Sequence, residues 1–562
     1  MSEKSRQAAQ HFIENETQFH LGFLPTEQSN PLTRTLEKDF AESCIKGVAT
    51  LQRPDRDVLA MAKKVFASAE YEKLVSTGVS ILTGGGKIIF SGCGATGRLS
   101  ILLESMWRTA CSSIPALEKY SNQVFSIMTG GDYALVKSVE SFEDYQVFGR
   151  RQAIELDINA NDMLIAITEG GETSSVLGSL FEALDRGAKA FLMFNNPADI
   201  LAEHLERSRK AIRDERVCVL DLFCGSMALA GSTRMQATTS EQLIAGCALE
   251  DMIAVLLGKE KEDHAADFEK LLDELESEPS CSAIAAFIDF ESSLYRKNGL
   301  ITYFANDFML DIFTDTTERS PTFMLPSFRK KDDSVSPRPW AFVKNPLFTT
   351  EDTWKNTMLR PLRCLEWQKQ DYIDMQVPEQ IVNNPPLIKA AELLKFEVGN
   401  ENIADRNSAD CTAAVLVTVC EKQSNENIYS AFAECSNGFA AVKHLSVGGC
   451  KDADFVIACS LKRSSLDIMG HMAIKLALNT ISTGVMAVLG RVTGNWMSWV
   501  AVSNKKLIDR AIRLICEIGE VDYTTSCNLL FESVEELEQN STGSKEQPSV
   551  VQYVLKEKLG KR

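Results

Sequence analysis

The chain has 562 residues and a formal net charge of −18, from 59 Lys and Arg against 77 Asp and Glu. A field of this sign repels nucleic acid and anionic membranes, so it excludes both as general partners, and any phosphate ligand must be held by local groups. Hydrophobic residues make up 44% and charged residues 24%, which is ordinary globular usage. At roughly 150 residues per domain, the chain is too long for a single core.

The first eighteen residues are polar and carry both signs of charge, unlike a signal peptide. No apolar run approaches the roughly 18 residues of a membrane helix. We therefore expect a cytoplasmic protein without a membrane partner, and a nuclear location stays open.

The cysteines are far apart in the sequence. The closest two of the fifteen are Cys218 and Cys224, and there is no C-x-x-C pair. This pattern predicts reduced thiols, Cys420 among them, with no metal site and no cofactor.

Secondary structure is predicted in chain order as follows. Residues 1–75 are amphipathic and helix-like. Residues 76–258 alternate short apolar runs with helical patterns, the runs being KIIF before Gly92, Val124–Met128, Met163–Ile167 and Lys189–Phe194. This alternation is typical of a parallel sheet wound with helices.

The second part of the chain repeats the same texture. Residues 259–295 are acidic at first and predict solvated connecting helices. Residues 296–510 hold three strand-like runs and a long buried helix, with a long ordered loop over Ser334–Leu347, and residues 511–562 predict a helical lid and tail. The predicted fold class is α/β, with two doubly wound parallel-sheet domains and a small C-terminal helical cap.

The sharpest local motif runs from Gly92 to Arg98, between a strand and a helix. Glycines at such a turn let backbone N–H groups approach an anion, and the helix N-terminus adds partial positive charge. The string also fits G-x-G-x-x-G, but a dinucleotide fold needs an acidic residue about 20 positions on, and the next strand ends only at Thr129–Asp132. We therefore expect a phosphate here, although Thr96 could equally be a simple helix N-cap.

A second loop, Thr168–Ser175, also follows a strand and is rich in glycine and hydroxyls. Loops at the carboxyl ends of neighbouring parallel strands face one crevice, where open α/β sheets bind ligands. One phosphate-bearing small molecule is the economical inference. The alternative is that both loops merely cap their helices.

Several motifs together resemble sugar-isomerase (SIS) domains, and in particular the N-acetylmuramic acid 6-phosphate etherases and the glucokinase regulatory proteins. They are GCGATGRLS, TGGDYALVKSVESFED, AITEGGETSSV, GSTRMQATT, LALNTISTGVM and VSNKKL, in this order over most of residues 80–530. The resemblance implies a tandem of SIS domains and a sugar phosphate as the ligand.

The two halves differ at the positions that matter in the etherases. The etherase catalytic Glu corresponds to Met106 in the first half, whereas the same offset in the second half falls on Glu318. The second half has Ala305–Phe308 in place of the glycine loop, which cannot cradle a phosphate. We infer an internal pseudo-dimer with one working pocket, to which each half contributes. A helix-terminal carboxylate is the alternative role for Glu318.

The resemblance also implies the site residues. Sugar-phosphate contacts carry over to Ala95, Thr96, Gly97, Glu143, Thr168, Glu169, Gly170, Thr173, Glu318, Asn504 and Lys506. Ala95 replaces a hydroxyl residue, so its contact could only be through backbone. Glu143 and Glu318 would be the catalytic pair of a lyase. Gln236 stands where a lysine is common, so a cation is lost unless Arg98 or Arg234 compensates.

Three functions remain open from the sequence. The first is a regulatory protein that binds fructose 6-phosphate or fructose 1-phosphate and modulates a sugar kinase, a hexokinase or glucokinase. An enzyme inhibitor is expected, although the sequence leaves the sign of the regulation open. The second is an etherase-type carbon–oxygen lyase. The third, a sugar-phosphate isomerase, has only the domain resemblance behind it, because no His or Lys base lies beside the loops and fold alone carries no activity.

Overall fold

The computed structural model describes residues 1–408, 411–419, 426–539 and 548–561. It contains two five-stranded parallel sheets, with strand orders β2-β1-β3-β4-β5 and β10-β9-β8-β6-β7. Read from its other end, the second order matches the first strand for strand, so β1 corresponds to β6 and β3 to β8. The predicted α/β class with two parallel-sheet units is confirmed.

The first sheet and its helices follow a regular strand-helix alternation. The elements are β1 (Ile88–Gly92), α6 (Ala95–Ser113), β2 (Val124–Met128), α7 (Gln146–Glu155), β3 (Met163–Ile167), α8 (Ser174–Asp185), β4 (Lys189–Phe194), α9 (Ala198–His204), α10 (Glu206–Ile212), β5 (Val217–Asp221) and α11 (Gln236–Leu256). Short runs of apolar residues with Val, Ile, Leu and Phe form the central strands because both faces of a parallel sheet are covered by helices.

The second sheet is interrupted by a longer excursion of short helices. Its elements are β6 (Leu300–Phe304), α14 (Met309–Phe323), β7 (Ala341–Lys344), α15 (Thr350–Met358), α16 (Lys369–Asp374), α17 (Glu379–Asn383), α18 (Ala390–Leu393), α19 (Ala404–Asn407), β8 (Thr412–Val419), α20 (Glu426–Cys435), β9 (Ala441–Val447), β10 (Phe455–Ile457) and α21 (Ile468–Val488).

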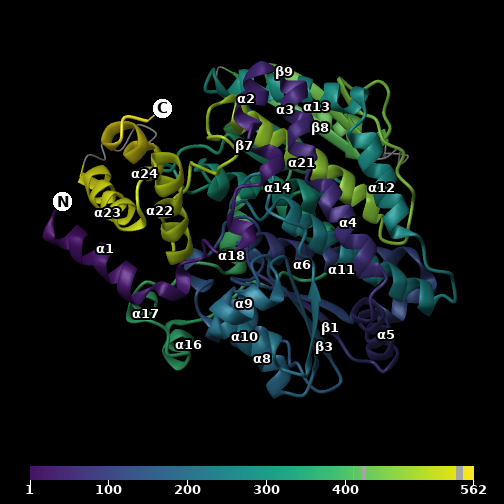
Figure 1. Cartoon of the computed structure of the whole chain (residues 1–562). Helices are drawn as coiled ribbons and strands as arrows, with labels where there is room; N and C mark the ends of the chain where they lie inside the picture. The colour runs from purple at the N-terminus through teal and green to yellow at the C-terminus, as the bar shows by residue number, and fades with distance from the viewer. Residues whose placement is uncertain (409–410, 420–425, 540–547, 562) are drawn as a thin grey trace.

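Helices from both ends of the chain and from its middle complete the structure. They are α1 (Glu3–Asn15), α2 (Leu36–Glu42), α3 (Cys44–Gln52), α4 (Asp55–Phe66), α5 (Ala69–Thr83), α12 (His264–Leu275), α13 (Glu278–Tyr295), α22 (Lys505–Gly519), α23 (Tyr523–Gln539) and α24 (Val550–Tyr553). In Figure 1 the C-terminal helices lie beside α1 at one side of the molecule, and α1 packs on α23. The tail therefore docks onto the beginning of the chain.

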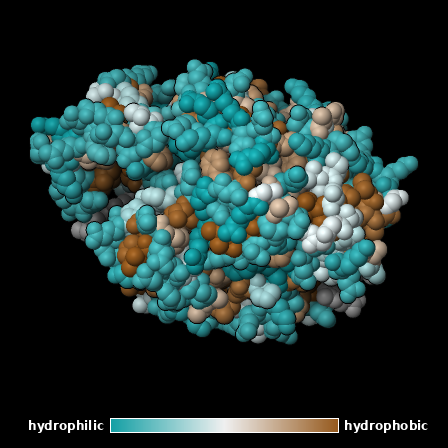
Figure 2. Space-filling view, turned by 90° about the horizontal axis from the view of Figure 1, so that it is seen from below, coloured by the Kyte–Doolittle hydropathy of each residue, from teal (hydrophilic) through white to brown (hydrophobic). Residues whose placement is uncertain are grey.

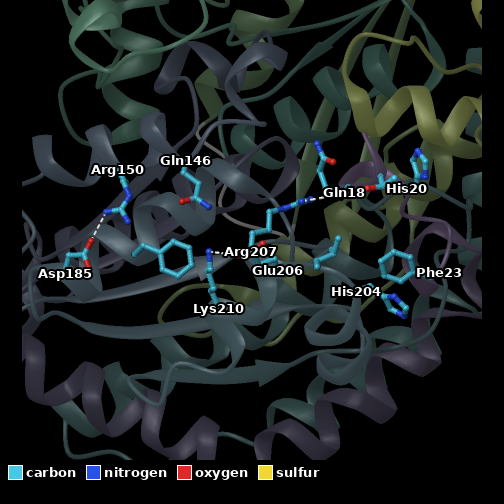
Figure 3. Close-up of a pocket in the computed structure, with 13 residues that line it drawn as sticks. Gln18, His20, Phe23, Gln146, Arg150, Asp185, His204, Glu206, Arg207 and Lys210 are labelled. Carbon is cyan, nitrogen blue, oxygen red and sulfur yellow. Dashed lines mark hydrogen bonds and ion pairs between the residues drawn. The ribbon is translucent and has the colours of Figure 1, made fainter. Parts of the chain in front are cut away.

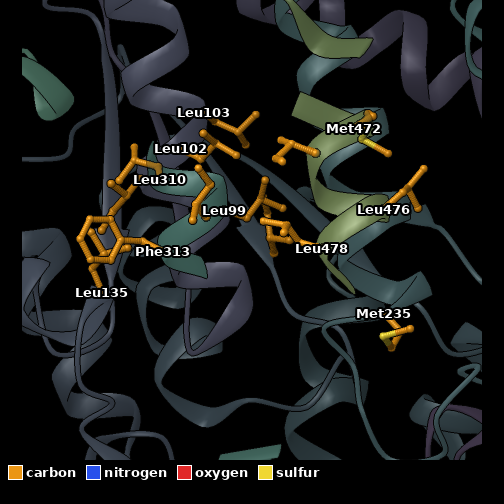
Figure 4. Close-up of a cluster of buried hydrophobic side chains, with 14 of the residues drawn as sticks. Leu99, Leu102, Leu103, Leu135, Met235, Leu310, Phe313, Met472, Leu476 and Leu478 are labelled. Atoms are coloured by element: carbon orange, nitrogen blue, oxygen red, sulfur yellow. The ribbon is translucent and has the colours of Figure 1, made fainter. Parts of the chain in front are cut away.

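The two halves share one continuous hydrophobic core. Figure 4 shows leucines of α6 meeting Leu310 and Phe313 of α14, with Met472 and Leu476 of α21 beside them. These helices pack across the pseudo-twofold relation between the sheets. Because apolar residues of both halves fill the same interior, the halves are fixed against each other as in a dimer.

Some details differ from the sequence predictions. Ser334–Leu347 is not a loop throughout, because Ala341–Lys344 forms β7 and pairs with β6. The strands β5 and β9 were not predicted. β9 has the polar residues Lys443, His444 and Ser446 in a strand of seven residues, which weakens its apolar pattern. The stretch after residue 259 is not simply solvated, because α12 buries an apolar face with Phe268 and Leu271. Cys420 lies outside the described residues.

The surface in Figure 2 is mostly hydrophilic, with hydrophobic residues in small separate groups. Among the described residues no helix is long and apolar enough to cross a membrane. No described group of three or more His, Cys, Asp or Glu is placed to hold a metal ion.

We predict that Gly149→Ala destabilises the fold, because α7 crosses α8 at a very short distance. A Cβ at Gly149 would lie 1.7 Å from the backbone oxygen of Ser175. The helices must separate to admit it, so we expect a loss of about 1–3 kcal/mol in the free energy of unfolding, measured in urea. Ser76→Ala on the exposed face of α5 is the control, within about 0.5 kcal/mol of the unaltered chain. Equal stability of both variants would contradict this packing.

Candidate functional site

The first predicted loop joins β1 to α6 and is held by its own hydrogen bonds. Gly94 has a positive φ of 58°, which favours glycine. A Cβ at Gly97 would lie 2.7 Å from Met128 Cγ. The Thr96 hydroxyl accepts a bond from the Cys93 N–H at 3.0 Å and donates to the Cys93 carbonyl at 2.9 Å. Thr96 thus shapes the loop, and the first N–H groups of α6 have no acceptor within the helix.

The second loop joins β3 to α8. The Thr168 hydroxyl donates to the Thr173 hydroxyl at 3.1 Å, and the Gly171 N–H bonds the Thr168 carbonyl at 2.9 Å. Since β1 and β3 are paired neighbours in parallel register, both loops leave the same edge of the sheet. The structure therefore brings the two predicted loops to one crevice edge.

The segment that carries Glu143 lies against the beginning of α8. The Ser175 N–H donates to the Glu143 carbonyl at 3.1 Å. The Glu143 carboxylate is near enough to Lys506 to contribute to the raised pKa of that lysine, which burial opposes. Glu143 is thus placed between the second loop and the tail.

The tail enters the site through α22. The Asn504 side chain caps this helix by accepting the Leu507 N–H at 2.9 Å. Lys506 Nζ lies 2.9 Å from Glu172 Oε1 at the second loop. Glu172 is also paired with Arg207, whose Nη2 lies 3.2 Å from Glu172 Oε2. Lys506 is therefore held beside the second loop by a carboxylate of that loop.

A turn from the beginning of the chain secures this arrangement. Glu27 is buried and accepts bonds from Arg510 and Arg513 of α22, with contacts of 2.6 and 2.7 Å. Burial raises the pKa of Glu27, but the two arginines outweigh it and hold it at about 2. The neighbouring Thr26 bonds Asn196, whose amide donates to the Gly170 carbonyl at 3.1 Å. The turn thereby ties α22 to the second loop.

The second half of the chain contributes Glu318 from α14. Its carboxylate pairs with the guanidinium of Arg98, which is 1% exposed and also donates to the carbonyls of Leu135 and Ala134. Glu318 and Ala95 line the same cavity of about 20 Å³ between the halves. A residue of the second half therefore faces the first glycine loop.

The electrostatics of the site centre on Glu169. Burial raises the pKa of Glu169 to about 7; Lys506 lowers it, while Glu318 and Glu172 raise it further. Burial also opposes ionisation of Glu172, but Lys506 and Arg207 outweigh it and lower the pKa of that carboxyl. Carboxyl groups of unequal proton affinity around one ligand can divide acid and base roles.

Sequence reasoning missed several residues of this site. Glu172 lies inside the predicted loop, but nothing in the sequence indicates that it pairs with Lys506 some 330 positions later. Glu27 and Asn196 have no local signal, because their roles arise from packing of distant segments.

Gln236 donates to Asp55 at 2.8 Å, so this position is structural here. Both arginines that could compensate for the missing lysine already have a carboxylate partner. Arg98 pairs with Glu318, and Arg234 pairs with Asp315 at 2.9 Å.

A cavity of about 900 Å³ on the outer side of α7, α8 and α10 contains none of the predicted site residues (Figure 3). Its charged side chains are largely paired with one another, as Arg150 is with Asp185 at 2.8 Å. Arg207 is the residue through which it adjoins the site, because this side chain also binds Glu172. The convergent carboxylates and the glycine loops lie elsewhere, so the chemistry is assigned to the crevice edge.

Comparison with known proteins agrees with this geometry. The family described as the glucokinase regulatory protein N-terminal SIS domain matches residues 71–184. An N-acetylmuramic acid 6-phosphate etherase of Lactococcus lactis subsp. lactis is 30% identical over 225 residues, covering 40% of this chain and 68% of the relative. A protein of the same name from Pectobacterium atrosepticum is 30% identical over 264 residues, covering 46% of this chain and 79% of the relative.

Among solved structures, a tagatose-6-phosphate ketose/aldose isomerase of Escherichia coli aligns over 82% of this chain and 96% of its own, with a TM-score of 0.44 and 10% identity. The fold and the crevice define an SIS-domain protein. The chain belongs to the family of sugar-phosphate-binding SIS proteins that includes the N-acetylmuramic acid 6-phosphate etherases and the glucokinase regulatory protein SIS domain.

The raised pKa of Glu169 predicts a pH-dependent effect of Glu169→Gln. The folded chain keeps this carboxyl protonated up to about pH 7, whereas the unfolded chain ionises it near 4.5. Its contribution to the free energy of unfolding therefore falls as the pH rises between these values. We expect the variant to gain roughly 2–3 kcal/mol relative to the unaltered chain between pH 5 and pH 8, measured by urea unfolding.

Glu260→Gln, at an exposed position, is the matched control and should show a difference that does not change with pH. A difference between Glu169→Gln and the unaltered chain that is constant from pH 5 to pH 8 would show that Glu169 titrates normally.

Proposed function

We propose that the chain binds a sugar phosphate at the crevice edge and cleaves a carbon–oxygen ether bond of that sugar, as an etherase of the N-acetylmuramic acid 6-phosphate type. The observation that carries this proposal is a chain of close charges beside two glycine loops at one sheet edge. Glu143 and Glu169 interact with Lys506, and Glu318 interacts with Glu169. Relatives named as such etherases, at 30% identity, support it.

The phosphate has a suitable place in this site. α6 and α8 both begin at the same sheet edge, after glycine-containing loops. In α8 the Ser175 N–H is already bonded to the Glu143 carbonyl. Helix N-termini favour anions, and Lys506 adds a full positive charge close by. The overall charge of −18 makes such local groups necessary.

The carboxylates supply the chemistry. One of them removes a proton from the carbon next to the sugar carbonyl, the electron pair forms a carbon–carbon double bond, and the ether carbon–oxygen bond breaks. A second carboxyl protonates the departing lactate oxygen. We assign Glu143 and Glu318 as this acid/base pair, and Glu169 as a third carboxyl that still holds a proton near neutral pH. Positioned groups of this kind contribute about 10²–10⁴-fold each.

We expect the chain to release lactate from N-acetylmuramic acid 6-phosphate, measured by a coupled lactate assay. Glu318→Gln and Glu143→Gln should each lower kcat about 100-fold or more, since each removes a proton-transfer group. Glu260→Gln, an exposed Glu outside the site, should keep full activity. Undiminished lactate release by both site variants would remove these residues from the mechanism.

A regulatory sugar-phosphate-binding function is the second candidate, favoured by the fusion of two unequal halves. Met106 replaces the acid in the first half, and Asn306–Phe308 replace the glycine loop in the second, so the pseudo-dimer retains one glycine-loop site. The match of residues 71–184 to the glucokinase regulatory protein family supports it. In this case the ligand is fructose 6-phosphate or fructose 1-phosphate, and the partner is a hexokinase or glucokinase.

The regulatory candidate predicts binding without turnover. Fructose 6-phosphate or fructose 1-phosphate at 100 times its Kd should stabilise the chain by about 2.7 kcal/mol, seen as a rise in Tm. Lys506→Met should remove most of this effect, whereas Lys505→Met, at a neighbouring lysine that pairs with Glu16, should retain it. Inhibition of a glucokinase that depends on the fructose phosphate, without lactate release, would favour regulation over catalysis. No thermal shift with either ester would count against it.

A further inference from the structure

The pseudo-twofold relation produces a second pocket where the other site of a symmetric dimer would lie. It has a volume of about 390 Å³ and is lined by the β6–α14 loop, the middle of α6, α15 and the beginning of α21. Met106 of α6 faces it, at the position that corresponds to Glu318. The pocket is therefore the counterpart of the crevice site. In the crevice site the first half supplies the glycine loop and the second half supplies Glu318, whereas here the second half supplies the loop and the first half supplies Met106.

This pocket is unsuited to a phosphate. The loop that would cradle an anion carries the side chains of Asn306, Asp307 and Phe308 where the first half has Gly94, Ala95 and Thr96. Phe308 adopts a positive φ of 55°, which is a strained conformation for a bulky residue. An aromatic side chain and a carboxylate therefore stand in this loop in place of the small residues that let backbone N–H groups approach an anion.

The charge of the pocket has the opposite sign to that of a phosphate site. Asp307, Asp311 and Asp467 line it, and its described lining residues include no Lys or Arg. Asp467 is paired with Arg463 at 2.8 Å, outside the lining. Asp307 is exposed and contacts the amide of Asn306 at 3.2 Å.

Asp311 gives an independent indication of a ligand. It is 4% exposed, and its Oδ2 lies 2.8 Å from His471 Nδ1. Its Oδ1 is buried and has no hydrogen-bond partner among the described residues. A buried carboxylate oxygen without a donor costs about 1–3 kcal/mol or more, so such atoms usually receive a donor from the protein, from an ordered water or from a bound ion or ligand.

The remaining lining is aromatic and apolar. Phe308 lies against His471 with ring centroids 4.5 Å apart, and Phe348 and Met106 add further apolar surface. Aromatic faces attract cations as well as apolar groups. The pocket therefore combines an acidic end with an apolar wall, as in sites that hold an amine by its charge and its carbon skeleton.

We propose that this second pocket binds a small, unphosphorylated ligand that carries a protonated amine, with the ammonium group at Asp311 and the apolar part against Phe308 and Met106. The ammonium supplies the missing donor to Asp311 Oδ1 and neutralises the local excess of carboxylates. Asp311 also lines the small cavity that contains Ala95 and Glu318, so the two sites adjoin at this residue. The proposal does not depend on the reaction assigned to the crevice site.

Calorimetry on the full chain at pH 7 in an amine-free buffer tests the proposal with three probes of similar shape. We expect benzylammonium to bind at least tenfold more tightly than benzyl alcohol, and benzoate to show no binding. Asp311→Asn should lower the affinity for benzylammonium at least tenfold. Glu351→Gln, on the exposed face of α15, should leave it unchanged.

Met106→Lys provides a second variant should Asp311→Asn fail to fold. It places an ammonium group in the pocket from the other half of the chain, and we expect it to abolish benzylammonium binding while circular dichroism stays unchanged. The proposal is overturned if benzylammonium does not bind, if benzyl alcohol or benzoate binds as well, or if a folded variant at Asp311 or Met106 binds benzylammonium normally.

Discussion

The ion pair between Arg98 and Glu318 is the interaction on which the site depends. Arg98 lies in the first turn of α6, directly after the first glycine loop, and is almost fully buried. It bonds the Leu135 carbonyl as well as Glu318. Removing one partner of a buried pair leaves the other charge uncompensated, at a cost of about 3–5 kcal/mol. The pair therefore fixes both the relative position of the halves and the presence of a second-half carboxylate beside the loop.

The tail contributes to the site by a comparable mechanism. Glu27 binds two arginines of α22. Thr26, in the same turn, bonds Asn196, and the amide of Asn196 bonds the Gly170 carbonyl in the second loop. Lys506 is thus positioned by the docking of its own helix onto Glu27, near the beginning of the chain, and by its ion pair with Glu172. A lysine on an unsecured tail would lose more conformational entropy on meeting a ligand, so this docking favours a preorganised site.

Two unequal pockets follow from the pseudo-symmetry. In a symmetric dimer each site receives the same loop and the same opposing residue. Fusion of the halves removes this restriction, and here one pocket keeps glycines and a carboxylate while the other carries Phe308 and Met106. Divergence of this kind allows one chain to bind ligands of opposite charge.

Strand-helix alternation, glycine loops and the tail lysine could all be found in the sequence, because they depend on residues close together in the chain. The strands β1 to β4, β6, β8 and β10 were predicted in this way. Local patterns could not identify β7, which lies in a segment rich in Pro and aromatic residues. The buried face of α12 was missed although Phe268, Leu271, Leu272 and Leu275 have the spacing of an apolar helix face. From the sequence, the Thr96 hydroxyl could bond a phosphate or cap its own helix. In the structure it bonds the Cys93 N–H and carbonyl within the loop.

By itself the sequence determined the two-unit α/β class and the positions of the two glycine-containing loops, since backbone periodicity and glycine are local properties. Only the tertiary structure decided that Glu318 faces the first loop, that Glu172 receives Lys506, and that burial raises the pKa of Glu169 to about 7. These features depend on distance and solvent exclusion between segments hundreds of residues apart, and no stretch of sequence encodes them alone.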